Sequence, residues 1–159
     1  MKYRRFEELP VWQAAIELAV GVFALTAKPS FRGHSGTRNQ LENATVSVSN
    51  NIAEGFERGT TQELLTFIYI SRGSAGEVRS MLHLLARLPE FSNFESEISD
   101  LRARAESISK QLRAWADSLQ NSEIKGQRYL TDKSRRLEEQ RKEREEFLKE
   151  LDQIRQRRI

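Results

Sequence analysis

Basic side chains recur at helical intervals in two stretches of this sequence, where they could neutralise phosphate groups. The first set has steps of 7, 4 and 4 residues and consists of Arg72, Arg79, His83 and Arg87. The second has steps of 8 and 3 and consists of Arg102, Lys110 and Arg113. Such steps place each set on one face of a helix. Cationic groups in a line suit a nucleic-acid backbone, with an affinity that falls steeply with salt. The candidate nucleic-acid contacts are Arg72, Arg79, Arg87, Arg102, Lys110 and Arg113.

A solvated helix face is the alternative interpretation of both sets. Glu77 and Glu106 are interspersed among the basic residues. The formal net charge of the chain is only +3, with a pI near 9.4. This balance permits nucleic-acid binding without demanding it, so both interpretations stay open on the sequence.

The segment SNNIAEGFER, residues 49–58, carries a second pattern. Two asparagines and a glycine cost a helix interior from some tenths to about 1 kcal/mol each, so propensity does not explain them. Their amides can donate and accept hydrogen bonds across to a neighbouring helix. We interpret the segment as a helix–helix or subunit contact in preference to a ligand site. Small residues on the next helix suggest a close approach by another backbone. The predicted contact residues are Asn50, Asn51, Glu54, Arg58, Gly73, Ser74 and Gly76.

Catalytic and metal-binding patterns are missing from the sequence. It has no cysteine and two histidines, His34 and His83, and neither forms the Glu-x-x-His pair that di-iron bundles use. There is no Gly-rich phosphate loop and no nucleophile–histidine–acid arrangement. We therefore expect a protein that is not an enzyme and that binds no cofactor or metal.

Four helical segments must position these residues. The first runs from about Pro10 to Ala27, the second to about Arg58 with Gly59 as its stop, the third to about Leu88 before Pro89, and the fourth to about Gln120. Three capping boxes, Thr37-x-x-Gln40, Thr60-x-x-Glu63 and Ser92-x-x-Glu95, are predicted to begin the last three helices.

Each helix has an apolar seam with steps of mostly 3 and 4 residues. No stretch alternates with a period of two, so no sheet is expected. Four seams with short connections predict an all-α, up-down-up-down antiparallel four-helix bundle. The first helix is apolar over a wide arc, as for a helix used both in the core and against a partner. The predicted seams are Trp12, Ala15, Ala19, Val22, Phe23 and Thr26, beside a parallel line of Val11, Leu18 and Leu25; Leu41, Thr45, Val48, Ile52 and Phe56; Leu64, Ile68, Ser71, Ala75, Val78, Leu82 and Leu85; and Ile98, Leu101, Ala105, Ile108, Leu112, Trp115 and Leu119.

Beyond the bundle, predicted at residues 1–122, the composition changes. Residues 123–131 are expected to form a linker and 132–159 a charged helical tail, with ten basic and eight acidic side chains and a net charge of +2. A frayed, solvated tail is the alternative.

The N-terminus lacks the apolar run of a signal peptide, and the longest apolar run is too short to span a bilayer. We expect a cytoplasmic protein with no membrane contact.

Ordered motifs along residues 3–120 resemble those of the bacterial four-helix bundle family, also called the 23S rRNA intervening-sequence protein family. It is related to the accessory variability determinant of diversity-generating retroelements. The resemblance implies a homopentamer and suggests nucleic-acid binding, although the tail extends beyond the family pattern. The motifs are Phe6-x-x-Leu9-x-Val11-Trp12-Gln13-x-Ala15, Gln40-Leu41, Asn51-Ile52-Ala53-Glu54-Gly55 with Arg58, and Phe67-x-x-x-Ser71-x-Gly73-Ser74-x-x-Glu77.

Two functional hypotheses follow. In the first, a homo-oligomer, expected to be a pentamer, binds RNA or DNA through basic helix faces, and assembly multiplies a weak single-subunit affinity. In the second, the bundle is a scaffold or accessory subunit whose charged tail, residues 132–159, recruits a partner protein.

Overall fold

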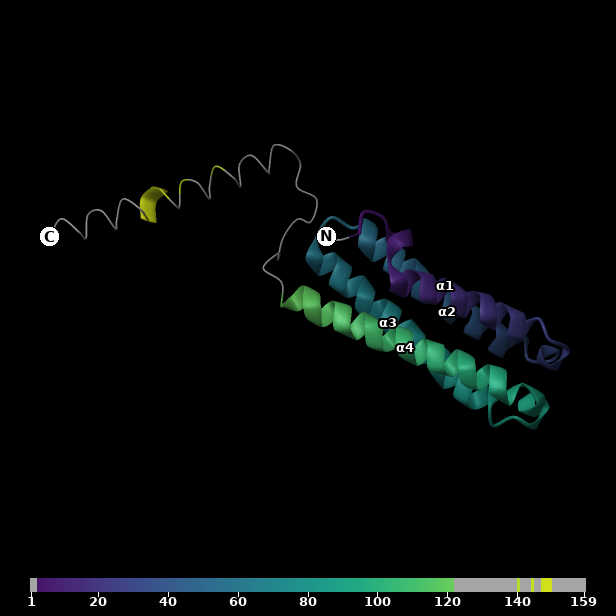
Figure 1. Cartoon of the computed structure of the whole chain (residues 1–159). Coiled ribbons are helices and arrows are strands. Elements are labelled where there is room, and N and C mark those ends of the chain that lie inside the picture. The colour runs from purple at the N-terminus through teal and green to yellow at the C-terminus, as the bar shows by residue number, and fades with distance from the viewer. Residues whose placement is uncertain (1–2, 122–139, 141–143, 145–146, 150–159) are drawn as a thin grey trace. The chain divides into compact units, whose positions relative to one another are not determined.

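The computed structural model describes residues 3–121, 140, 144 and 147–149, and every regular element longer than one residue within them is helical (Figure 1). Short 3-10 helices precede the first long helix and lie in two of the connections. The four long helices are α1 (Pro10–Thr26), α2 (Ser35–Glu57), α3 (Thr61–Leu85) and α4 (Glu95–Gln120), and the 3-10 helices span Phe6–Glu8, Pro29–Phe31 and Pro89–Phe94.

Successive helices run in opposite directions along the bundle (Figure 1). Both α1 and α3 contact α2 and α4, so each helix has two neighbours and the core lies between all four. The up-down-up-down four-helix bundle predicted from the sequence is confirmed.

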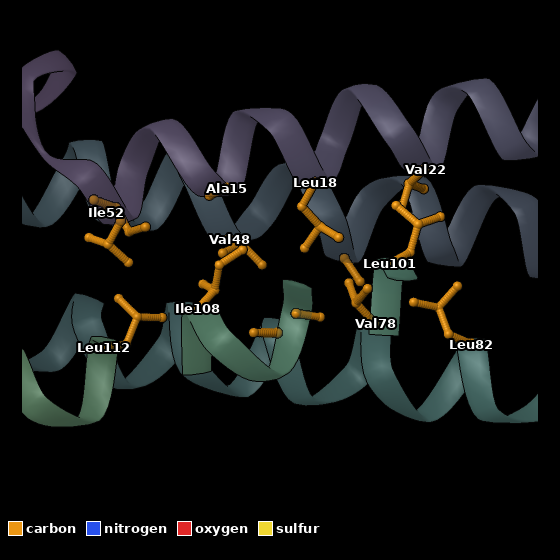
Figure 2. Packing of buried hydrophobic residues seen from close by; sticks show 14 of the residues in the cluster. Ala15, Leu18, Val22, Val48, Ile52, Val78, Leu82, Leu101, Ile108 and Leu112 are labelled. Carbon is orange, nitrogen blue, oxygen red and sulfur yellow. The ribbon is translucent and has the colours of Figure 1, made fainter. Parts of the chain in front are cut away.

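The core is built from the predicted seams of α2 and α3, which are confirmed at every position. Leu41 begins the seam of α2 and Leu64 that of α3, and all their members are at most 1% exposed. In α4 the seam is buried from Ile98 to Leu112, while its last turn buries Ala116 and leaves Trp115 and Leu119 half-buried. Figure 2 shows side chains from all four helices meeting in this interior.

The predicted seam of α1 is wrong in detail. The buried line consists of Val11, Ala15, Leu18, Val22 and Leu25, in steps of 4 and 3, with Thr26 beside it. Phe23, predicted as a core residue, is 47% exposed. Both apolar lines of this helix are regular, so spacing did not decide between them.

One of the three predicted capping boxes is present. The Thr60 hydroxyl accepts a hydrogen bond from the backbone N–H of Glu63 at 3.2 Å and donates to the Glu63 carboxylate at 2.8 Å. Thr37 does not cap a helix, because the left-handed backbone of Gly33 (φ 89°) turns the chain early and α2 begins at Ser35.

The third capping box, at Ser92, is also wrong. Ser92 lies inside the 3-10 helix that begins at Pro89, and α4 starts at Glu95 without a side-chain cap. Burial of Phe91 against Phe31, with ring centroids 4.8 Å apart, holds this connection in its 3-10 form. Packing of aromatic rings therefore outweighs the capping preference of a serine.

Close backbone approach within the bundle occurs at Gly55 and is not seen at Gly73 or Gly76; contact of those two glycines with another subunit stays a prediction. A Cβ atom added to Gly55 would lie 2.6 Å from Cβ of Phe67, where the end of α2 meets the start of α3. The same atom added to Gly73 or Gly76 meets no described atom within 4 Å.

The chain divides into two units, Met1–Gly126 and Gln127–Ile159. The predicted linker at 123–131 and most of the predicted tail lie outside the described residues. Within the second unit, Gln140, Arg144 and residues 147–149 are helical, with Phe147 60% exposed. Among the described residues, no helix combines the length and apolar character that crossing a bilayer requires.

Candidate nucleic-acid interface

Four of the six predicted basic contacts meet at one groove between α3 and α4. Because these helices pack antiparallel, the basic face of α3 lies along the basic face of α4. The groove, here called the α3–α4 groove, has a volume of about 350 Å³. Its lining residues are Arg72 and Arg79 from α3, and Glu106, Ser109, Lys110, Arg113, Ala114 and Asp117 from α4.

The two cations from α4 are already paired with carboxylates on their own helix. Lys110 Nζ lies 2.8 Å from the Glu106 carboxylate, one turn away. Nε of Arg113 donates to both oxygens of Asp117, at 3.0 and 2.9 Å. Exposed pairs of this kind contribute little to stability and exchange readily with an incoming anion. Four cations and two carboxylates give the groove a formal charge of +2.

The two arginines from α3 differ from this pattern. In the part of the chain that the structure describes, neither Arg72 nor Arg79 has a carboxylate within ion-pair distance. Nε of Arg79 is buried and has no hydrogen-bond partner among the described residues. A buried N–H without an acceptor is costly, and a turn of the Arg79 side chain toward the groove would let this group donate to a phosphate oxygen.

Glu106 remains a carboxylate in this surrounding. The ammonium of Lys110 lowers the pKa of Glu106, first through its hydrogen bond and then through its charge, and the charges of Arg79 and Arg102 lower it further. At neutral pH the α3–α4 groove therefore holds an anion near Arg79. This carboxylate opposes the binding of any phosphate placed beside it.

The remaining two predicted contacts lie outside the groove, around His83. Nη1 of Arg102 is 3.2 Å from Nδ1 of His83. Nη1 of Arg87, a residue just beyond the end of α3, donates to the backbone carbonyl of His83 at 3.2 Å. These two arginines extend the basic line toward the end of the helix pair where α3 finishes.

Sequence reasoning missed a contact beyond the opposite end of the groove, one turn from Arg72 and Asp117. Nε2 of Gln120 donates to the hydroxyl of Tyr69 at 2.7 Å, which joins α4 to α3. The Tyr69 side chain is 42% exposed. Only the relative position of the two helices identifies Gln120 as the partner of this tyrosine.

The predicted polar contact residues separate into two groups. Asn51 is in a chain of hydrogen bonds between helices: its Nδ2 donates to the Ser47 carbonyl and hydroxyl at 2.7 and 2.9 Å, and the Ser47 hydroxyl lies 2.9 Å from that of Ser74 on α3. Glu54 and Arg58 pair with each other on the surface at 2.6 Å. Asn50 is exposed.

A shallow polar pocket of about 400 Å³ lies along the outer face of α2 and includes Asn50, Asn51 and Glu54. Phe23 of α1 forms its apolar margin, and Val20, on the same helix, is 61% exposed. This outer side of α1 and α2 combines large apolar groups with amides and two carboxylates. Such a mixed surface is suited to contact with another protein chain.

Three comparisons relate the chain to known proteins. The sequence model of a family described as 23S rRNA-intervening sequence protein matches residues 7–114. A crystal structure of a protein with unknown function from the S23 ribosomal protein family of Bacteroides thetaiotaomicron has a TM-score of 0.59, with 18% identity over 67% of this chain and 97% of that chain. Identity at that level shows a common fold. Among curated proteins, none matches this chain.

Proposed function

Because this chain belongs to the 23S rRNA-intervening sequence protein family and has a basic groove between two helices, we propose that it is a non-enzymatic, homo-oligomeric nucleic-acid-binding protein. One observation carries the proposal: Arg72 and Arg79 enter the α3–α4 groove without a carboxylate partner among the described residues, and Arg79 has a buried Nε to satisfy. The family name refers to 23S rRNA, which makes RNA the first ligand to test.

Phosphate binding in the α3–α4 groove would proceed by exchange of partners. Arg72 and Arg79 are the first contacts, since they release no carboxylate when they bind. Lys110 and Arg113 can then turn from Glu106 and Asp117 toward the phosphate oxygens, at small cost because these pairs are exposed. Each neutralised phosphate releases counterions into the solvent, which supplies most of the binding free energy.

The first prediction is a steep dependence of affinity on salt. Up to four phosphate contacts in each groove predict a slope of log K against log salt of about −3 for a single strand, because each contact contributes about −0.7. Filter binding of short single-stranded RNA and duplex DNA between ~25 and ~200 mM salt measures this slope. If neither nucleic acid is retained at the lowest salt, the proposal is wrong.

Self-association is the second part of the proposal, with a pentamer as the expected assembly. It is supported by Val20 and Phe23, large apolar side chains that are 61% and 47% exposed on α1. A second copy covering this side would remove them from water. Several grooves in one assembly would also bind one nucleic acid together, so that modest affinity at each becomes avidity.

The second prediction tests assembly through paired neutral substitutions. Val20→Gln with Phe23→Gln removes the apolar contact without changing charge. We expect light scattering to report a smaller species than for the wild-type chain, and nucleic-acid affinity to fall by about tenfold or more as avidity is lost. The matched control is Ala103→Gln at an exposed position of α4, outside the groove. A wild-type chain that is monomeric at micromolar concentration contradicts the proposed assembly.

A further inference from the structure

We infer that the α3–α4 groove accepts a single strand of nucleic acid, with one base stacked on Tyr69, and that it discriminates against duplexes. This inference rests on the proposed function and specifies the ligand of the same site. It is based on the position of the Tyr69–Gln120 contact, which lies one turn from the cations and carboxylates of the groove.

The aromatic ring lies in line with the phosphate contacts. Tyr69 precedes Arg72 by one turn of α3, and Gln120 follows Asp117 by one turn of α4, so their contact lies one turn beyond the residues that line the groove. From Tyr69 to Arg79 the rise along α3 is about 15 Å, the reach of a short stretch of extended strand. A strand whose phosphates contact the arginines therefore brings a base to the ring.

The ring is held in place and partly open to solvent. The hydrogen bond from Gln120 Nε2 to the Tyr69 hydroxyl, at 2.7 Å, restrains the side chain from the opposite helix. With 42% of the side chain exposed, apolar surface remains for a base to cover. Stacking on an aromatic side chain is tolerant of sequence, because every base has a π-face.

A base on Tyr69 favours a single strand over a duplex. In a duplex the bases are paired and stacked on one another, so none is free to cover the Tyr69 ring. Glu106 and Asp117 also line the groove, beside Lys110 and Arg113. The unpaired bases adenine, guanine and cytosine carry amino groups, and RNA adds 2′-hydroxyls, which can donate to these carboxylates.

The test compares three probes that carry phosphodiester charge: a short oligodeoxythymidylate, an abasic oligonucleotide of the same length, and a duplex. Fluorescence anisotropy with the full chain at low salt gives each affinity. We expect the thymidylate to bind about tenfold tighter than the abasic strand. Tyr69→Ala should remove this preference while leaving abasic binding unchanged, and Tyr69→Phe, which keeps the ring, should retain most of it.

Each result has a distinct meaning. Equal affinity for thymidylate and abasic strands, or tighter binding of the duplex, overturns the inference while the proposed phosphate site stands. Loss of affinity for all three probes in Tyr69→Ala assigns the tyrosine to holding α3 against α4, which also overturns stacking. Failure of the wild-type chain to bind any probe overturns the proposed function itself, and the inference with it.

Discussion

Arg72→Glu combined with Arg79→Glu is expected to reduce nucleic-acid affinity by about a hundredfold or more at low salt. The double substitution removes two cations from the α3–α4 groove and adds two carboxylates, so its formal charge changes from +2 to −2. Neither arginine has an ion-pair partner among the described residues, so no described pair is lost. Filter binding across a salt series measures the effect, and the salt slope should become shallower along with the loss.

A control with the same total charge separates the groove from the net charge of the chain. Arg32→Glu with Arg104→Glu also takes the formal charge from +3 to −1, but both residues are exposed and lie outside the groove. This variant should lose affinity only modestly. If the two double variants bind equally weakly, nonspecific attraction explains binding and the groove has no special part in it. Thermal unfolding of each variant confirms that the bundle remains folded.

A third variant is expected to raise nucleic-acid affinity and so provides a further test. Glu106→Gln removes one of the two carboxylates of the groove and releases Lys110 from its 2.8 Å pair. Because Lys110, Arg79 and Arg102 lower the pKa of Glu106, this residue is ionised at neutral pH, and the substitution changes the charge by one. Affinity is therefore expected to rise about severalfold.

The bundle itself could be predicted because the seams of α2 and α3 have no competitor. In each helix one apolar line runs at steps of 3 and 4, and every member of it is buried. In α1 two apolar lines lie side by side, and only the packed structure decides that Leu18 is buried while Phe23 is exposed. Burial depends on where neighbouring helices lie, which spacing within one helix does not specify.

The groove could be predicted in part for a similar reason. Spacing placed Arg72 and Arg79 on one face of a helix, and Lys110 and Arg113 on one face of the next. Their meeting depends on the longitudinal alignment of α3 and α4, which is set by the connection that includes the 3-10 helix Pro89–Phe94. In this connection, aromatic packing outweighed the capping preference of Ser92, so the sequence did not predict its conformation. For the same reason, the sequence did not separate Arg87 and Arg102 from the other four.

Close packing around Gly55 explains why the motif at the end of α2 contains a glycine, which helix propensity did not explain. The motif SNNIAEGFER lies at the end of α2, where the chain turns into α3. A Cβ at position 55 would lie 2.6 Å from Cβ of Phe67 and 3.4 Å from the backbone oxygen of Leu64. These atoms belong to or adjoin the backbone of α3, so they move only if the helix moves. Glycine is the residue that allows the two helices to approach this closely.

Gly55→Ala is accordingly expected to destabilise the protein by a net of about 1 kcal/mol, because forced separation of packed helices costs about 1–3 kcal/mol. Alanine's better helix propensity, worth up to about 1 kcal/mol, offsets only part of the overpacking cost. Thermal unfolding followed by circular dichroism should show a melting temperature lower by about 5 °C.

Gly76→Ala is the matched control, since it makes the same change in a helix where an added Cβ meets no described atom within 4 Å. Propensity alone then predicts a gain of about 1 kcal/mol. The two glycines should therefore shift the melting temperature in opposite directions. An increase for both would mean that α2 and α3 separate without cost at Gly55. A decrease for both, with a smaller assembly for Gly76→Ala, would mean that the open face of α3 is covered by another copy of the chain.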